Sequence, residues 1–247
     1  MELGLFALYV MLIAVAEALT TFMDPVYGVS LHAIILISLL VLSALKSSGN
    51  PSSLFLSLSL APLIRIVSLS LPLAYFPRYA WYLVAGLAVL LAALTLMRVE
   101  GLGFREVGVT FSSPLAQVAV GLTGIPFGII EYYILRPEPL AVGMPLTDIV
   151  LLAVALIFFT GFAEELVFRG VMQRSAVEAF GWKAGLLGVS VVFSILHMGW
   201  LSTLDVLFVF TIGLFFGFIA FKTGSIIGVS LSHGLTNVIL FLLMPTR

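Results

Sequence analysis

Long apolar runs follow one another along almost the whole of this 247-residue chain, with short polar breaks between them. A helix that crosses the hydrocarbon core of a bilayer needs about 20 mostly apolar residues. On this scale the sequence predicts nine spans, although eight are almost as well supported. The second is short and the third contains Pro62, Arg65 and Pro72, so either could be broken or re-entrant. The predicted spans are 3–22, 31–45, 54–76, 79–97, 115–135, 147–168, 184–200, 204–221 and 225–244.

The composition excludes most other fold classes. Hydrophobic residues make up 62% of the chain, charged residues only 9%, and the mean hydropathy is +1.24. Soluble domains are about half apolar and about a quarter charged, so this excess does not fit a soluble, disordered or disulfide-stapled protein. The apolar runs also lack the alternation of a β-barrel wall. We therefore expect an all-α, polytopic transmembrane helix bundle, with residues 1–247 forming a single integral membrane domain.

The charged residues indicate a partner and an orientation. Eleven Lys and Arg against twelve Asp and Glu, without a basic run, leave no footprint for nucleic acid, so the expected partner is the lipid bilayer. Cysteine is absent, which excludes thiolate metal sites and a cysteine nucleophile. Six loop cations on the N-terminal side against three on the other favour a cytoplasmic N-terminus in the cell membrane. The six are Lys46, Arg98, Arg105, Arg174, Lys183 and Lys222, and the three are Arg78, Arg136 and Arg247. The polar stretch 98–114 is expected on the membrane surface.

Two adjacent carboxylates, Glu164 and Glu165, lie at the end of an apolar run, with Arg169 four residues after Glu165. A charge at mid-bilayer costs roughly 2.5–3.5 kcal/mol on insertion scales, so such residues are functional candidates. On a helix Glu165 and Arg169 share a face. Glu164 is rotated by about 100° from Glu165, so we expect the two carboxylates to serve different partners. The alternative without a function is an interfacial ion pair that ends a helix.

Two histidines and an asparagine complete the candidate site. His197 ends an apolar run, and His233 and Asn237 are spaced i,i+4 and so project from one helix face. Glu165 and His197 each lie 16 residues from the centre of a turn predicted at 180–182, or about 24 Å along each helix. If the first helix is continuous through residue 170, the two side chains lie level. The sequence thus predicts one buried polar layer rather than separate packed residues.

This set of residues suits hydrolysis of an amide. A carboxylate and an imidazole can activate water, and a second histidine with Asn237 can donate hydrogen bonds to a developing oxyanion. No covalent enzyme intermediate is needed. The same residues allow a zinc site, because Glu164, His197 and His233 are zinc ligand types. We favour the metal-free version, since no two histidines have the i,i+4 spacing of H-E-x-x-H.

Three motifs carry a resemblance to a known family. They are Glu164-Glu165-x-x-Phe168-Arg169, Phe193-x-x-x-His197 and His233-x-x-x-Asn237. In order and placement they resemble the motifs of the CAAX protease and bacteriocin-processing (CPBP) family, which are intramembrane endopeptidases related to type 2 CAAX prenyl proteases. The resemblance covers residues 147–243, which we expect to form a catalytic helical core. Residues 1–114 are then accessory N-terminal spans.

The resemblance implies a catalytic role for four residues. Glu164 resembles the base that activates water, assisted by His197, while His233 and Asn237 resemble the pair that stabilises the oxyanion. No cofactor is favoured, although zinc is possible. The implied substrate is a membrane-associated peptide or a prenylated protein, cut in a cavity open to the cytoplasm.

The remaining motif positions are expected to support the site. Glu165 and Arg169 resemble residues that orient it, and Phe168 and Phe193 match positions with packing roles. Two alternatives use the same polar layer without hydrolysis. One is a membrane scaffold or bacteriocin self-immunity protein. The other is a proton-coupled transporter, which predicts broken helices and repeated halves, but the sequence has no repeat.

Four further polar residues lie inside predicted spans: Glu17, His32, Arg65 and Glu131. They could line the cavity, but structural pairing is the better-supported interpretation because no motif includes them. Glu17 and Arg65 are expected to pair between early helices. Glu131 is the one expected to approach the site, because its span directly precedes the helix with the two glutamates.

Overall fold

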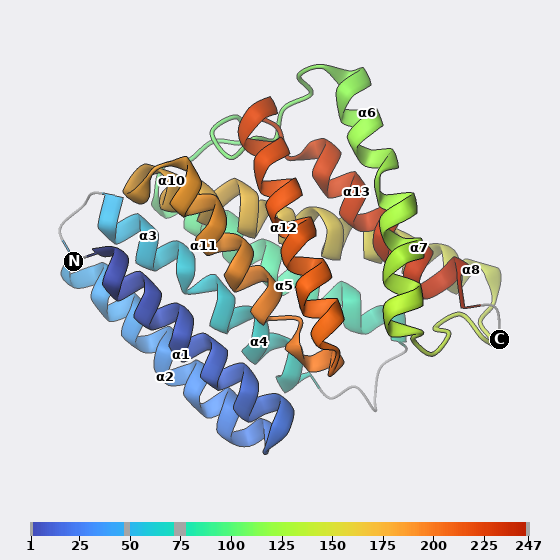
Figure 1. Ribbon diagram of the computed structural model, residues 1–247, viewed down its shortest axis with the longest axis horizontal. Helices are drawn as coiled ribbons and strands as arrows, with labels where there is room; N and C mark the ends of the chain where they lie inside the picture. The colour runs from blue at the N-terminus through green and yellow to red at the C-terminus, as the bar shows by residue number, and fades with distance from the viewer. Residues whose placement is uncertain (1, 47–49, 72–77, 246–247) are drawn as a thin grey trace.

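The computed structural model describes residues 2–46, 50–71 and 78–245 (Figure 1). Within these ranges all regular structure is helical, and eight helices are long and apolar enough to cross a membrane. A ninth apolar helix, Ile227–Leu243, is shorter. The predicted all-α polytopic bundle is therefore confirmed. The predicted end of the third span, residues 72–76, lies outside the described residues.

The first five helices form the N-terminal part. They are α1 (Glu2–Phe22), α2 (Pro25–Leu45), α3 (Asn50–Leu58), α4 (Leu60–Ser70) and α5 (Arg78–Val99). The second span is longer than predicted and unbroken. It begins at Pro25 because the Asp24 side chain accepts a hydrogen bond from the Val26 N–H at 2.8 Å, and proline is favoured at the first helical position. The third span is broken after Leu58, whose carbonyl cannot receive an N–H from Pro62.

The C-terminal part contains the predicted site. Its elements are α6 (Pro114–Leu122), α7 (Gly124–Leu135), α8 (Leu146–Ala155), η2 (Leu156–Phe162), α9 (Ala163–Glu165), η3 (Leu166–Met172), α10 (Gln173–Phe180), α11 (Trp182–Ile195), η4 (Met198–Trp200), α12 (Thr203–Thr223), α13 (Ile227–Val238) and η5 (Ile239–Leu243). The elements from α8 to α10 form one continuous helix of 35 residues. The span predicted to end at residue 168 therefore continues to the turn at Gly181.

Glycine permits this helix to continue beside the polar stretch 98–114. A Cβ on Gly170 would lie 2.9 Å from the carbonyl oxygen of Val107, so the loop packs directly on the helix. Val107 is buried, and the carbonyl of Gly108 accepts a hydrogen bond from the Ile226 N–H at 2.8 Å. The loop is thus bound to two helices. Its predicted location on the membrane surface stays a prediction.

Close helix contacts set the geometry of the site. Helix α13 packs along η2, and α11 packs against both α10 and α12 (Figure 1). A Cβ on Gly161 would lie 2.7 Å from the backbone nitrogen of Gly234, and a Cβ on Gly234 would lie 2.6 Å from the Cα of Ile157. Small residues let backbones approach closely in a membrane. These two glycines bring α13 against the helix with the glutamate pair.

Candidate active site

The two glutamates lie on a short α-helical turn between two wide, π-helical segments. The N–H of Ala163 bonds to the carbonyl of Phe158, and the N–H of Gln173 bonds to that of Phe168, both five residues back. Such wide turns are rare and are frequent at functional sites. They change which side chains face the bundle interior, and the apolar pattern gave no sign of them.

Glu165 is fully buried and is held from two sides. Its Oε1 lies 3.0 Å from Nη1 of Arg169 and 2.9 Å from Nδ1 of His233. The Arg169 guanidinium also donates to the Gly213 carbonyl at 3.3 Å and lies over the Phe193 ring, 4.3 Å from its centroid. Glu165 and Arg169 were predicted to share a helix face, and in the structure they form an ion pair.

Both carboxylates approach one histidine, contrary to the expectation that they serve different partners. His233 Nδ1 contacts Glu165, and its Nε2 lies 4.0 Å from Oε2 of Glu164. The prediction was wrong because an imidazole carries nitrogens on two edges and can face two side chains at once. A carboxylate accepts only, so the Glu165 contact is a hydrogen bond when Nδ1 carries a hydrogen.

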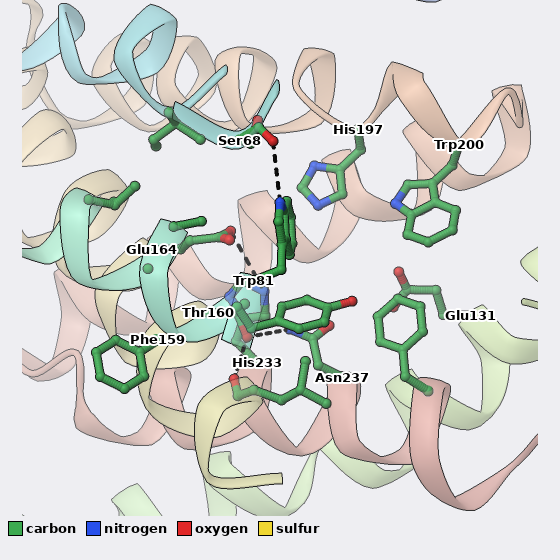
Figure 2. Close-up of a pocket in the computed structure, with 17 residues that line it drawn as sticks. Ser68, Trp81, Glu131, Phe159, Thr160, Glu164, His197, Trp200, His233 and Asn237 are labelled. Carbon is green, nitrogen blue, oxygen red and sulfur yellow. Dashed lines mark hydrogen bonds and ion pairs between the residues drawn. The ribbon is translucent and has the colours of Figure 1, made fainter. Parts of the chain in front are cut away.

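A cavity of about 200 Å³ lies beside Glu164 (Figure 2). Its wall includes Glu164, His197, His233 and Asn237, so the structure brings together the four residues predicted to do chemistry. Glu164 is 27% exposed in its side chain, whereas Glu165 is 0% exposed and does not line the cavity. Glu164 is therefore the carboxylate of the pair that a molecule in the cavity can reach.

His197 lies beyond the end of its helix. The predicted span 184–200 agrees with the membrane-spanning segment Trp182–Trp200, but within that segment α11 stops at Ile195 and a short 3₁₀ turn follows at Met198–Trp200. His197 Nδ1 lies 2.9 Å from the Phe193 carbonyl oxygen. A carbonyl only accepts, so Nδ1 donates in this hydrogen bond, and a neutral ring then has an unprotonated Nε2.

Asn237 is oriented by a residue that sequence reasoning missed. Its Nδ2 donates to Oγ1 of Thr160 at 3.1 Å, and the Thr160 hydroxyl donates to the Leu156 carbonyl. Thr160 also lines the cavity (Figure 2). A hydroxyl in an apolar run, four residues before Glu164, was the available signal. Thr160 thus fixes which way the Asn237 amide faces.

Two phenylalanines pack beneath the histidines. The rings of Phe168 and Phe193 meet edge to face with centroids 5.0 Å apart, and both residues are buried. Phe193 also lies 4.9 Å from the His197 ring and 5.8 Å from the His233 ring. Such aromatic contacts limit ring rotation. The two residues occupy the packing positions expected for them.

The other predicted polar residues divide into two groups. Glu17 pairs with Arg65 as expected, with Nε of Arg65 2.6 Å from Oε1 of Glu17. His32 joins them, since its Nε2 lies 3.1 Å from the same oxygen. Glu131 lines the cavity, as expected of the one that approaches the site. Among the described residues, no three His, Cys, Asp or Glu side chains form a group suited to hold a metal ion.

Fold and site together define a multi-pass membrane protein with a polar, glutamate- and histidine-lined cavity inside its helix bundle. Residues 145–239 match the family model described as type II CAAX prenyl endopeptidase Rce1-like, which confirms the resemblance carried by the three motifs. At the family level this match supports a CAAX-type intramembrane endopeptidase, and hence a peptidase. No curated protein and no solved structure matches the chain.

Proposed function

We propose that this protein hydrolyses a peptide bond of a membrane-associated, lipid-anchored substrate, using water activated by Glu164 with His197. The observation that carries the proposal is the division of labour between adjacent carboxylates. Glu165 is buried against Arg169 and His233, while Glu164 is accessible from the cavity. A general base must be within reach of the proton it removes, and Glu164 alone of the pair meets that requirement.

In the proposed reaction Glu164 takes a proton from water, and the resulting hydroxide attacks the carbonyl carbon. His197 assists through its Nε2, which is unprotonated in a neutral ring whose Nδ1 donates to the Phe193 carbonyl. As the tetrahedral intermediate collapses, the proton moves to the leaving amine. The products are a peptide carboxylate and an amine, so the step balances without a covalent enzyme intermediate.

His233 and Asn237 are the proposed oxyanion donors. His233, with a hydrogen on each nitrogen, would donate Nδ1–H to Glu165 and present Nε2–H toward the cavity. The Asn237 amide has two N–H groups, and its contact with Thr160 uses one of them. Donors held in place before the reaction stabilise developing charge better than mobile ones. Glu165 and Arg169 therefore act by orienting His233.

The cavity wall supports a lipid-linked substrate. Most of its lining is apolar, and the aromatic residues include Trp81, Phe159, Trp200 and Phe241. An acyl or prenyl chain could lie against these side chains while the peptide reaches Glu164. We propose that the protein resides in the cell membrane. The cavity residues Ser68, Trp81 and Trp200 lie near helix ends on the side opposite the N-terminus, so a cavity that opens toward the cytoplasm requires the N-terminus to lie on the other side of the membrane. Residues 147–243 would form the catalytic core, and residues 1–114 the accessory spans.

A zinc-dependent version of the reaction is the second candidate. Glu164, His197 and His233 line one cavity and are zinc ligand types. Against it, no three His, Cys, Asp or Glu side chains among the described residues are grouped so that they could hold a metal ion. We therefore favour the metal-independent reaction. A scaffold or immunity role does not require Glu164 to be accessible from the cavity, so this accessibility favours the catalytic role.

The test is cleavage of fluorogenic CAAX peptides, prenylated and unprenylated, by detergent-purified protein. General acid–base groups contribute about 10²–10⁴-fold, so Glu164→Gln should lower kcat by at least about 100-fold. His197→Ala should also lower it. Glu178→Gln, on an exposed part of α10, is the matched control and should cleave normally. Full cleavage by Glu164→Gln would contradict the proposal, and no cleavage by the wild type would favour the scaffold.

A further inference from the structure

Three ionisable side chains from the first spans meet away from the cavity. Glu17 of α1 and His32 of α2 are both fully buried, and Arg65 of α4 joins them with its side chain 16% exposed. Oε1 of Glu17 lies 2.6 Å from Nε of Arg65 and 3.1 Å from Nε2 of His32.

The same guanidinium makes a second contact that links this cluster to the candidate active site. Arg65 Nη2 donates a hydrogen bond to the carbonyl oxygen of Leu196. Leu196 follows the last residue of α11, and its peptide group leads directly into His197. Carbonyls at a helix C-terminus lack intrahelical partners, and a cation there is favourable. Arg65 therefore caps α11 at the peptide bond that carries His197.

Helix α4 also forms part of the cavity wall. Ile64 and Ser68, on either side of Arg65 in sequence, both line the cavity that contains His197 (Figure 2). The Ser68 carbonyl accepts a hydrogen bond from Trp81 Nε1 at 3.3 Å. The α4 residues of this wall and Arg65 itself lie outside residues 145–239, the part of the chain that matches the family model.

We infer that Arg65 is a positioning residue for His197, held in place by Glu17, and that the first spans thereby complete the active site. The inference rests on the proposed function for its catalytic consequence, but its structural consequence stands separately. His197 lies on a turn beyond the end of α11, where its N–H bonds to the Ser194 carbonyl at 3.0 Å and its carbonyl accepts from the Trp200 N–H at 3.1 Å. Two further contacts act on this turn: the Phe193 carbonyl bonds the His197 ring, and Arg65 bonds the carbonyl of the preceding peptide.

Arg65→Lys separates positioning from charge pairing. Lysine keeps the positive charge for Glu17, but its ammonium lacks the rigid fork that lets arginine bond two acceptors at set positions. Arg174→Lys is the matched control. Arg174 also bridges a carboxylate, Glu178 at 3.0 Å, and a loop carbonyl, that of Glu106 at 3.1 Å, but it lies at the protein surface.

The first readout is steady-state cleavage. A displacement of about 1 Å can lower a rate about 100-fold, so Arg65→Lys should reduce kcat by about 10- to 100-fold while KM changes less than about twofold. Arg174→Lys should leave both constants unchanged. In a His197→Ala background, Arg65→Lys should cause no further loss. An unchanged kcat in folded Arg65→Lys, or an equal further loss without His197, would overturn the inference.

The second readout does not need activity. The chain contains only three histidines, so isotope-labelled histidine gives three ring signals by NMR, assigned by single substitutions. Arg65→Lys should move or split the signals of His197 and of His32, and leave that of His233 in place. An unmoved His197 signal would refute the positioning role. If the wild type cleaves no peptide but the His197 signal moves, the proposed function fails while the positioning role survives.

Discussion

The buried ion pair between Glu165 and Arg169 gives a quantitative prediction. Both side chains are at most 1% exposed, and the two residues are spaced i,i+4. Nine residues further along the same continuous helix, Arg174 and Glu178 form an i,i+4 pair whose side chains are 33% and 38% exposed. Glu165→Gln and Glu178→Gln each remove one carboxylate charge from an i,i+4 pair, one buried and one exposed, and Glu165→Gln also removes the charge that faces His233.

The expected difference follows from burial. Removing one partner of a buried pair leaves an uncompensated charge and costs about 3–5 kcal/mol of unfolding free energy. Arg169 keeps the Gly213 carbonyl and the Phe193 ring as partners, so the lower end, about 3 kcal/mol, is expected for Glu165→Gln. An exposed i,i+4 pair contributes only about 0.3–0.5 kcal/mol.

Reversible unfolding in mixed detergent and SDS micelles, followed by circular dichroism, measures both variants on one scale. The account predicts a large shift for Glu165→Gln and a shift near the detection limit for Glu178→Gln. Equal shifts, or a loss below about 1 kcal/mol for Glu165→Gln, would refute the reasoning. The Arg169 charge would then be compensated by other groups, and the proposed orientation of His233 by a charged Glu165 would lose its support.

Two further predictions concern packing and orientation. Gly161→Ala should destabilise the protein by about 1–3 kcal/mol, because the new Cβ would lie 2.7 Å from the Gly234 nitrogen. In the control Gly4→Ala the new Cβ has no atom within 4 Å, so this variant should be neutral or slightly stabilised. Equal unfolding midpoints for the two variants would contradict this prediction. Since the chain has no cysteine, single Cys substitutions report topology in intact cells. A membrane-impermeant maleimide should label Glu138→Cys and not Lys222→Cys, both at exposed positions, and the opposite pattern would reverse the proposed orientation.

The sequence was sufficient for features that depend on local spacing. Apolar runs of bilayer length predicted the spans, and the i,i+4 spacing of Glu165 and Arg169 predicted their contact. The start of α2 was missed although its signal was present, since Asp24 and Pro25 are a helix cap and a first-turn residue. The second span was predicted to be short because its apolar run begins several residues after the helix does.

Other features of the site depend on tertiary contacts that no local pattern encodes. The contacts around His197 include the Phe193 carbonyl at its ring and Arg65 at the Leu196 carbonyl, and Arg65 is 131 residues from Leu196 in the sequence. His233 lies between both glutamates because glycines at 161 and 234 bring two helices into backbone contact. The wide turns around the glutamates interrupt the regular helix, and the apolar pattern of the sequence carries no sign of them.

The central claim is that Glu164 and His197 activate water without a metal. The most direct test is cleavage of a CAAX peptide by wild-type protein that has been treated with chelator and shown by elemental analysis to hold far less than one metal ion per chain. The account predicts that this protein cleaves at the rate of the untreated enzyme and that added zinc does not increase the rate. Activity that disappears with the metal and returns in proportion to added zinc would contradict it.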